Sequence, residues 1–285
     1  GTPEAAKLIA FLRDELGANV DASAAVGIKP MTEKGSKRLV RAAIRHALAQ
    51  NLPSVTLVHK GNIMKFTEGA FRQHGYDVAK EEFAAQTVVE AEAASAPGKL
   101  VIKDRIADAM FQEALIRPEQ YSVLATPNLN GDYISDALAA QVGGLGLAPG
   151  VNMSEKLAFF EATHGTAPSL AGKDRANPGS LILSGALMLE HIGWKEAATR
   201  IYKAVNTAIA RRAVTEDLAA QMADARTVGC TEFGEYCAAV PIASQRLCRE
   251  KGRGGGVAKG AGRFSIKSHI KKGRKGTRFL PFPSA

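Results

Sequence analysis

Two aspartates four residues apart are the first candidates for chemistry in this sequence. Asp132 and Asp136 follow an expected turn at 128–131 and stand at the start of a predicted helix, 132–142. Residues four apart lie on one face of a helix, so both carboxylates would point the same way. Two oxygen donors in that arrangement suit a hard divalent cation such as Mg²⁺. From the spacing alone, a capping aspartate followed by a surface aspartate is the simpler interpretation.

Further features carry chemistry only weakly when each is taken alone. Asp104 and Asp108 repeat the four-residue spacing on another predicted helix, and the pattern does not choose between the two pairs. Lys60 follows a buried strand, where α/β folds bind ligands, although position alone favours a solvated loop lysine. The small residues of 164–168 would let backbone amides approach a phosphate. The glycine-rich run 143–146 is not a dinucleotide fingerprint, because it does not follow a strand and open a helix.

Alternating strands and helices would position these residues, which argues for an α/β fold. Helices are expected at about 3–16, 36–50, 106–116 and 132–142, and a further helix is expected after residue 62. Strands are expected at 24–29, 54–58 and 122–125, and a glycine-rich turn at 143–150. On the helix at 36–50, the basic residues are expected to form the solvated face.

Length and composition describe an ordinary globular protein. The chain has 285 residues, of which 46% are hydrophobic and 23% charged, enough for one large or two modest domains. The longest apolar stretch, 181–189, is far short of the ~20 residues that span a bilayer, and no signal segment opens the chain. The three cysteines lack zinc-ligand spacing. We therefore expect a cytoplasmic protein without a membrane partner.

The basic character of the chain belongs to its last segment. The net charge is +9, yet residues 241–285 hold 12 Lys and Arg against one Glu, which leaves 25 basic and 27 acidic residues elsewhere. That tail has no apolar period and is predicted to be disordered. Binding of nucleic acid through the tail is an alternative function of another class, although we do not expect nucleic acid as a partner.

Several longer runs resemble the bacterial isocitrate dehydrogenases, homodimeric members of the isocitrate/isopropylmalate dehydrogenase family. The runs are 58–70, 128–138, 160–168 and 177–180, and the likeness is nearly continuous from residue 1 to about 240. The resemblance implies the α/β fold of that family, which has no conventional Rossmann domain. It also implies a clasp-like segment at 1–32, a small α/β domain at 33–142 and the C-terminal part of a large cofactor-binding domain at 143–240.

The resemblance implies a reaction and residues for it. Isocitrate is oxidised by hydride transfer to NAD or NADP, CO₂ is lost, and the enolate is protonated to 2-oxoglutarate, with Mg²⁺ or Mn²⁺ bound to substrate oxygens. Asp132 and Asp136 resemble metal ligands of one subunit, and Asp108 resembles the ligand supplied by the partner subunit of a homodimer with shared active sites. Lys60 resembles the catalytic lysine, also supplied across the interface, and Asn62 lies near the substrate.

Cofactor residues follow from the same resemblance. The adenosine-binding loop and its surroundings correspond to Glu161, His164, Gly165, Thr166, Ala167 and Asn177. NADP-dependent bacterial members place Lys, Tyr, Tyr and Arg around the 2′-phosphate, and the matching positions here are Ser169, Leu170, Glu216 and Ala220. Because those cationic and phenolic donors are missing and a glutamate would repel the phosphate, we expect NAD to be favoured over NADP. Lys173 and Arg175 lie close enough in sequence to supply a replacement charge.

The family normally carries a substantial segment before the position of residue 1, with the arginines that bind the substrate carboxylates and the catalytic tyrosine. We therefore interpret the chain as a C-terminal portion with the N-terminal part absent, and we expect it to be inactive toward isocitrate on its own. Enzyme alternatives are 3-isopropylmalate and homoisocitrate dehydrogenase.

Overall fold

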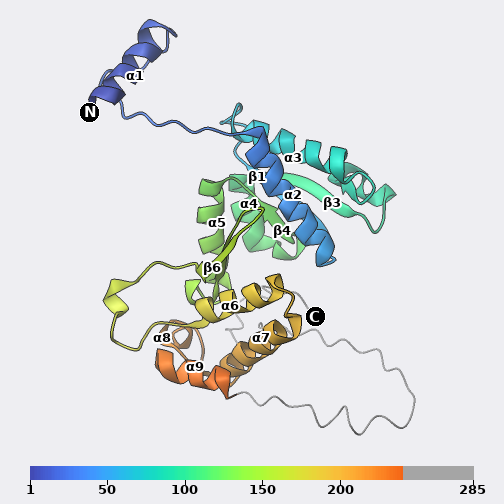
Figure 1. Ribbon diagram of the computed structural model, residues 1–285, viewed down its shortest axis with the longest axis vertical. Helices are drawn as coiled ribbons and strands as arrows, with labels where there is room; N and C mark the ends of the chain where they lie inside the picture. The colour runs from blue at the N-terminus through green and yellow to red at the C-terminus, as the bar shows by residue number, and fades with distance from the viewer. Residues whose placement is uncertain (240–285) are drawn as a thin grey trace. The chain divides into compact units, whose positions relative to one another are not determined.

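The computed structural model describes residues 1–239, which form two compact units (Figure 1). Unit 1 comprises residues 1–107 and 123–127, and unit 2 comprises residues 108–122 and the described chain from 128 onward. The tail expected to be disordered lies outside the described residues. Among the helices described, none has the length and apolar character needed to cross a membrane.

Unit 1 is built on a four-stranded parallel sheet with the strand order β2-β3-β1-β4. The strands are β1 (Ser54–His59), β2 (Thr87–Val89), β3 (Leu100–Ile106) and β4 (Val123–Ala125). Every residue of β1 is buried, as is typical of a parallel strand covered on both faces. The unit also contains α1 (Pro3–Asp14), α2 (Glu33–Ala49), α3 (Glu68–Glu82) and the 3₁₀ segment η1 (Glu90–Ser95). The predicted α/β fold is thereby confirmed.

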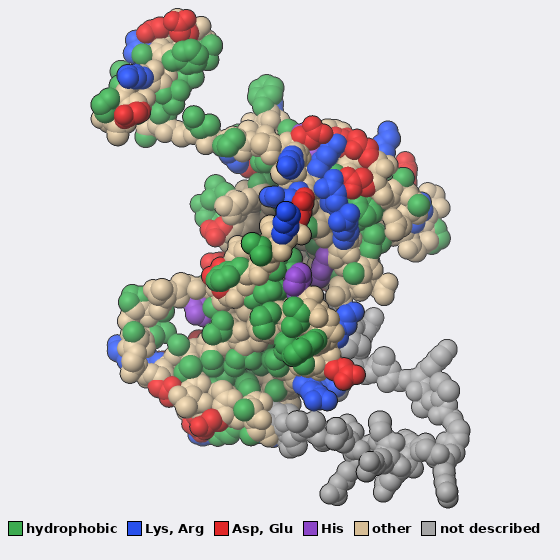
Figure 2. All heavy atoms as spheres, in the orientation of Figure 1, with side chains coloured by type: hydrophobic (Ala, Val, Ile, Leu, Met, Phe, Trp, Pro, Cys, Tyr) green, Lys and Arg blue, Asp and Glu red, His purple; other side chains and the backbone are tan. Residues whose placement is uncertain are grey.

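Helix α2 packs one apolar stripe on the sheet and turns its charges outward. Val40, Ile44 and Ala47 recur at helical spacing and are fully buried. On the flank beside this stripe, Lys37 pairs with Glu81 and Arg41 with Glu82, both glutamates belonging to α3. Figure 2 shows the resulting mixture of basic and acidic side chains over α2 and α3. Arg38 and Arg45 are exposed, as predicted for a solvated face, whereas Lys37 and Arg41 are only partly exposed because they pair with α3.

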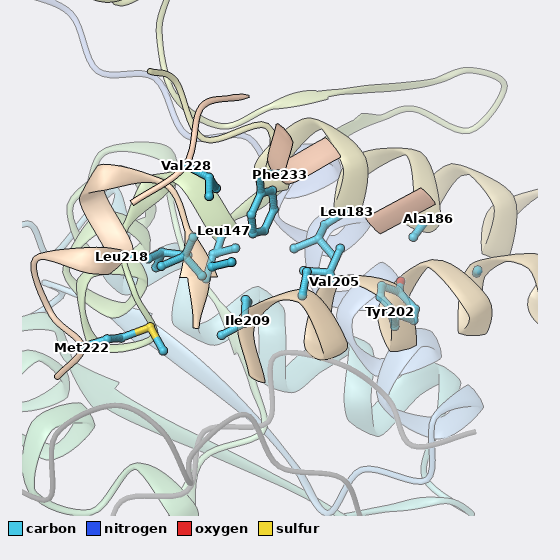
Figure 3. Close-up of a cluster of buried hydrophobic side chains, with 14 residues drawn as sticks. Leu147, Leu183, Ala186, Tyr202, Val205, Ile209, Leu218, Met222, Val228 and Phe233 are labelled. Carbon is cyan, nitrogen blue, oxygen red and sulfur yellow. The ribbon is translucent and has the colours of Figure 1, made fainter. Parts of the chain in front are cut away.

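Unit 2 is mainly helical around a core of its own. Its helices are α4 (Ala107–Ile116, from residue 108), α5 (Asn128–Gln141), α6 (Gly179–His191), α7 (Lys195–Ala210), α8 (Glu216–Ala219) and α9 (Cys230–Ala238). Strands β5 (Pro149–Met153) and β6 (Ala158–Ala162) form an antiparallel hairpin, and β7 (Ala213–Val214) pairs with β8 (Arg226–Thr227). Short 3₁₀ segments are η2 (Pro118–Gln120), η3 (Leu145–Leu147) and η4 (Pro168–Leu170). In Figure 3, Leu147, Leu218, Phe233 and Leu183 converge between these helices.

Three expectations from the sequence were wrong. Residues 24–29 form no strand, because no neighbouring strand of the described chain pairs with them. The segment 128–131 is the first turn of α5 rather than a turn before it, so Asp132 lies in the second turn. Asp104 does not lie on a helix: it belongs to β3, where it is in register with Leu57 of the parallel neighbour β1. At 143–150, Gly143 and Gly144 adopt positive φ as a glycine turn requires, before β5 begins.

Candidate functional site

The loop after β1 holds Lys60 by its backbone. The Lys60 N–H donates to Glu68 Oε2 at 2.5 Å. The Lys60 carbonyl accepts from the amides of Ile63 at 3.1 Å and Met64 at 2.9 Å. Both polar backbone groups of Lys60 are therefore bonded, while Asn62 is exposed in the same loop. The structure places Lys60 at the carboxyl end of β1, where the sequence predicted it.

A close approach between two glycines keeps this loop tight. The Gly61 amide donates to His59 Nδ1 at 3.0 Å. A Cβ built on Gly61 would lie 2.9 Å from Gly69 Cα and 3.0 Å from His59 Nδ1, so a larger residue would push the backbone apart. The end of β1 thus lies directly against the first turn of α3.

Asp104 collects three donors beneath the loop. Its carboxylate accepts from His59 Nε2 at 3.0 Å and from the Tyr76 hydroxyl at 2.6 Å, and pairs with Arg72 Nε at 3.1 Å. Burial raises the pKa of Asp104, but the hydrogen bonds from His59, Arg72 and Tyr76 lower it by more, so the net pKa is well below its usual range. Because Gly61 donates to Nδ1, we assign the His59 proton to Nε2.

Glu68 is a buried acid shared between two segments. Its side chain is 2% exposed and pairs with Lys29 Nζ, while its second oxygen accepts from the Lys60 amide. Glu68 is the first residue of α3, where the positive end of the helix dipole also favours a carboxylate. These contacts compensate a charge that would otherwise be costly to bury.

In unit 2, Asp132 and Asp136 are exposed one turn apart on α5. Within residues 1–239, neither carboxylate forms a hydrogen bond or an ion pair, so both keep their oxygen lone pairs for a ligand. Such a donor set fits Mg²⁺ or Mn²⁺, which prefer carboxylate oxygens and water. The chemistry of the pair therefore agrees with the metal that the sequence suggested.

Asp108 does not complete this pair within the described chain. It is exposed in the first turn of α4. Across residues 1–239, no three His, Cys, Asp or Glu side chains gather in a group that could hold a metal ion. The described residues of one chain thus bring two carboxylates together on α5, without a third protein ligand beside them.

The predicted cofactor loop lies between β6 and α6. The His164 ring approaches the Gly165 carbonyl through Nδ1 at 2.9 Å, Thr166 is exposed, and Ala167 adopts a left-handed backbone with φ of 43°. Ser169 is exposed in η4, and Leu170 ends that segment half-buried. The exposed amides of this loop remain compatible with an approaching nucleotide.

Two side chains anchor the C-terminal part of that loop. Asp174 accepts from the amide of Thr231 at 2.9 Å and from its hydroxyl at 2.8 Å, at the start of α9. The buried Asn177 accepts from the Gly179 amide at 2.8 Å and donates to Asp217 at 2.9 Å. The side chain of Asn177 is therefore engaged in holding α6 against α8.

Glu216 is joined to a cation. Arg175 Nε donates to Glu216 Oε2 at 2.8 Å, and Arg175 Nη2 pairs with the same oxygen. Both side chains are about half exposed, and Ala220 is exposed at the end of α8. The region expected to repel a phosphate thus contains a guanidinium. Glu161, on β6, accepts through Oε1 from the side-chain Nδ2 of Asn152 at 2.7 Å across the hairpin.

The sequence analysis assigned no role to Glu68 or His59, and it expected Asp104 on a helix. A glutamate directly after a threonine is common at the start of a helix and indicates nothing more. Only the fold shows that Glu68 is buried and accepts from the amide of Lys60, eight residues earlier. The pairing of His59 with Asp104 spans 45 residues, which no local pattern displays.

Comparison with known proteins gives a consistent result. The family described as isocitrate/isopropylmalate dehydrogenase matches residues 12–237. An isocitrate dehydrogenase (NADP) of Pseudomonas aeruginosa is 53% identical over 243 residues, covering 82% of this chain and 58% of that protein. An isocitrate dehydrogenase (NADP) of Archaeoglobus fulgidus is 52% identical over 241 residues, with the same coverage of 82% and 58%. The chain thus spans less than two thirds of the length of these relatives.

Solved structures agree with the sequence relatives. The crystal structure of isocitrate dehydrogenase from Methylococcus capsulatus has a TM-score of 0.66 and 39% identity, over 77% of this chain and 60% of that one. The TT0538 protein from Thermus thermophilus has a TM-score of 0.65 and 33% identity, over 75% of this chain and 40% of that one.

The expectation that NAD is favoured over NADP is wrong. The relatives from Pseudomonas aeruginosa, Archaeoglobus fulgidus and Helicobacter pylori are all named as NADP enzymes. The physical weakness of the expectation lies in Glu216, which was treated as an isolated anion. The ion pair with Arg175 offsets that charge and brings a cation to the same place.

Proposed function

Because the chain belongs to the isocitrate/isopropylmalate dehydrogenase family, we propose that it forms part of an enzyme that oxidises and decarboxylates isocitrate to 2-oxoglutarate. The observation that carries the proposal is the family match over residues 12–237, a range that includes Lys60, Asp132 and Asp136, which resemble catalytic and metal-binding residues of that family. The uncommitted carboxylates on α5 and the fixed loop of Lys60 support it.

Each residue of the site has a proposed task. Asp132 and Asp136 would hold Mg²⁺ or Mn²⁺, which when bound polarises the hydroxyl and carboxylate oxygens of isocitrate and stabilises the enolate. Lys60 takes the hydroxyl proton as the hydride leaves for the nicotinamide, and Asn62 helps to orient the substrate. Loss of CO₂ then leaves the electron pair of the broken bond as an enolate. A general acid protonates it at carbon (by the family resemblance, the tyrosine of the segment that precedes the position of residue 1), so the products are 2-oxoglutarate, CO₂ and the reduced coenzyme.

We propose NADP as the coenzyme. The loop 164–167, with Glu161 and Asn177 beside it, is assigned to the adenosine. The guanidinium of Arg175 is suited to bind a phosphate. It forms an ion pair with Glu216, whose position is expected near the 2′-phosphate. The names of the relatives support this assignment.

A homodimer with shared active sites is proposed from the surface of α4 and α5. These helices line an apolar groove of about 180 Å³ through Phe111, Leu115, Ile134 and Leu138. Leu115 is 59% exposed, although it is large and apolar. A second copy packed on this groove would cover it. Because α4 also carries Asp108, the same contact would bring that carboxylate toward the partner subunit.

The domain organisation and the cellular location are proposed from the family resemblance. We propose a clasp-like segment at 1–32, a small domain at 33–142 and the C-terminal part of a large domain at 143–240, in a cytoplasmic protein. The alternative function, binding of nucleic acid, was assigned to the basic tail, which lies outside the described residues.

Activity can be tested in a chimaera that joins this chain to the part of the Pseudomonas aeruginosa relative that it does not match. With isocitrate, Mn²⁺ and NADP, we expect formation of NADPH, and Lys60→Met should reduce turnover by about 10²-fold or more. Lys80→Met, an exposed change at the end of α3, is the matched control. Full activity of Lys60→Met would refute the assignment, and faster turnover of 3-isopropylmalate or homoisocitrate would replace isocitrate as the substrate.

Shared sites have their own test. Chimaeras carrying Lys60→Met or Asp136→Asn should each be inactive, whereas a refolded mixture should regain activity. Each hybrid dimer would then hold one site with both residues intact, and half of the dimers formed at random are hybrids. About a quarter of the activity of the unsubstituted chimaera is therefore expected. A mixture as inactive as its components would refute a site that combines the two subunits.

A further inference from the structure

We propose that Glu68 and the His59–Asp104 pair are positioning residues that direct Lys60 toward the reacting substrate. They would act through the loop that carries Lys60, without touching the substrate themselves. The proposal rests on the proposed catalytic role of Lys60, and it concerns contacts that lie entirely within unit 1.

Glu68 is better explained by the loop than by the helix it begins. A helix start is normally capped by a side chain such as Ser or Thr, yet Thr67 at the N-cap of α3 makes no capping hydrogen bond. Glu68 instead turns its buried carboxylate back to the Lys60 amide at 2.5 Å and pairs with Lys29. Burying a carboxylate costs free energy. That Glu68 is buried and bonded to the Lys60 amide therefore indicates that the position of the Lys60 backbone matters.

The His59–Asp104 pair fixes the other side of Lys60. With its proton on Nε2 and donated to Asp104, the buried His59 keeps Nδ1 free to accept the amide of Gly61. Protonation of Nδ1 would abolish that acceptor. Asp104 is itself held by Tyr76 and Arg72 of α3, so the imidazole is oriented from a helix as well as from β3.

The two arrangements together determine where the Lys60 side chain leaves the backbone. The amide before its Cα is bonded to Glu68, and the amide after it is bonded to His59. Fixing both peptide units leaves the Cα–Cβ direction of Lys60 little freedom, as a catalytic group requires.

The chimaera described above tests the proposal through kcat and KM. Glu68→Gln and Asp104→Asn should each lower kcat by about tenfold to a hundredfold, while KM for isocitrate changes less than twofold. Glu82→Gln, on the same helix and in an exposed pair with Arg41, and Asp77→Asn are matched controls expected to stay within twofold. Variants that match these controls, beside an inactive Lys60→Met, would overturn the positioning role alone. An active Lys60→Met would instead overturn the proposed function.

A second measurement covers the case in which a variant does not fold. On the unsubstituted 285-residue chain, long-range ¹H–¹⁵N NMR of the neutral imidazole should show the His59 proton on Nε2 and none on Nδ1. The amides of Lys60 and Gly61 should exchange with solvent as slowly as those of β1. The opposite tautomer, or exchange as fast as in an exposed loop, would overturn the proposal.

Discussion

Substitution of Gly61 by alanine is the sharpest test of the loop that carries Lys60. The added Cβ would lie 2.9 Å from Gly69 Cα and 3.1 Å from Gly69 N, and both are backbone atoms that cannot rotate away. Carbon atoms pack at about 3.5–4.0 Å, so the end of β1 and the start of α3 would have to separate by at least about 0.6 Å. Overpacking of this kind costs about 1–3 kcal/mol.

The expected loss is therefore about 1–3 kcal/mol in the opening free energy of unit 1, measured by native-state hydrogen exchange of the β1 amides. In the chimaera, kcat should also fall, by up to about 10²-fold if Lys60 moves by about 1 Å. Gly27→Ala is the matched control, because a Cβ there meets nothing within 4 Å and its φ is not in the left-handed range. If Gly61→Ala exchanged and turned over like Gly27→Ala, the steric reasoning would be refuted.

Three further predictions concern the cofactor region, the groove and acid stability. Arg175→Gln should lower the ratio of kcat/KM for NADP to that for NAD by about tenfold, or about 1.4 kcal/mol, and an unchanged ratio would remove Arg175 from the phosphate site. Leu115→Glu should turn a dimeric chimaera into monomers in sedimentation, because a charge would be buried in an apolar contact, whereas persistence of the dimer would place the interface elsewhere. The folded pKa of Asp104 is lowered from 3.8, so its contribution to stability is present above that pH and is lost as the pH falls further. Asp104→Asn should therefore be less stable at pH 7 and lose less stability on acidification than the unsubstituted chain, as followed by denaturant unfolding.

The sequence predicted elements whose pattern is local. Strand β1 is a continuous apolar run, and α2 repeats its apolar residues at helical spacing, so both were found within a few residues of their ends. Strand β3 was missed because Lys103, Asp104 and Arg105 follow one another in it. Three charges in a row are typical of a solvated helix, and only partners such as Glu90, which pairs with Arg105, make them compatible with a sheet.

The proposed preference for NADP could not be predicted from single residues compared position by position. The missing lysine and the presence of Glu216 both indicate NAD by position, although Arg175 lies close enough in sequence to supply a replacement charge. Arg175 and Glu216 are 41 residues apart, and their ion pair changes what each contributes. A charge that is neutralised by its neighbour no longer excludes a phosphate in the way that an isolated one does.

Asp104 and Asp108 illustrate why spacing cannot assign a metal ligand without the fold. Strand β3 ends between them, so Asp104 lies in the sheet of unit 1, while Asp108 lies in the first turn of α4, in unit 2. A carboxylate that already accepts from His59, Tyr76 and Arg72 has few lone pairs left for a cation. Asp104 is thereby bonded to the segment that carries Lys60, whereas the ligand role proposed for Asp108 rests on the family resemblance. Two aspartates with the same four-residue spacing thus lie on different kinds of element and have different surroundings.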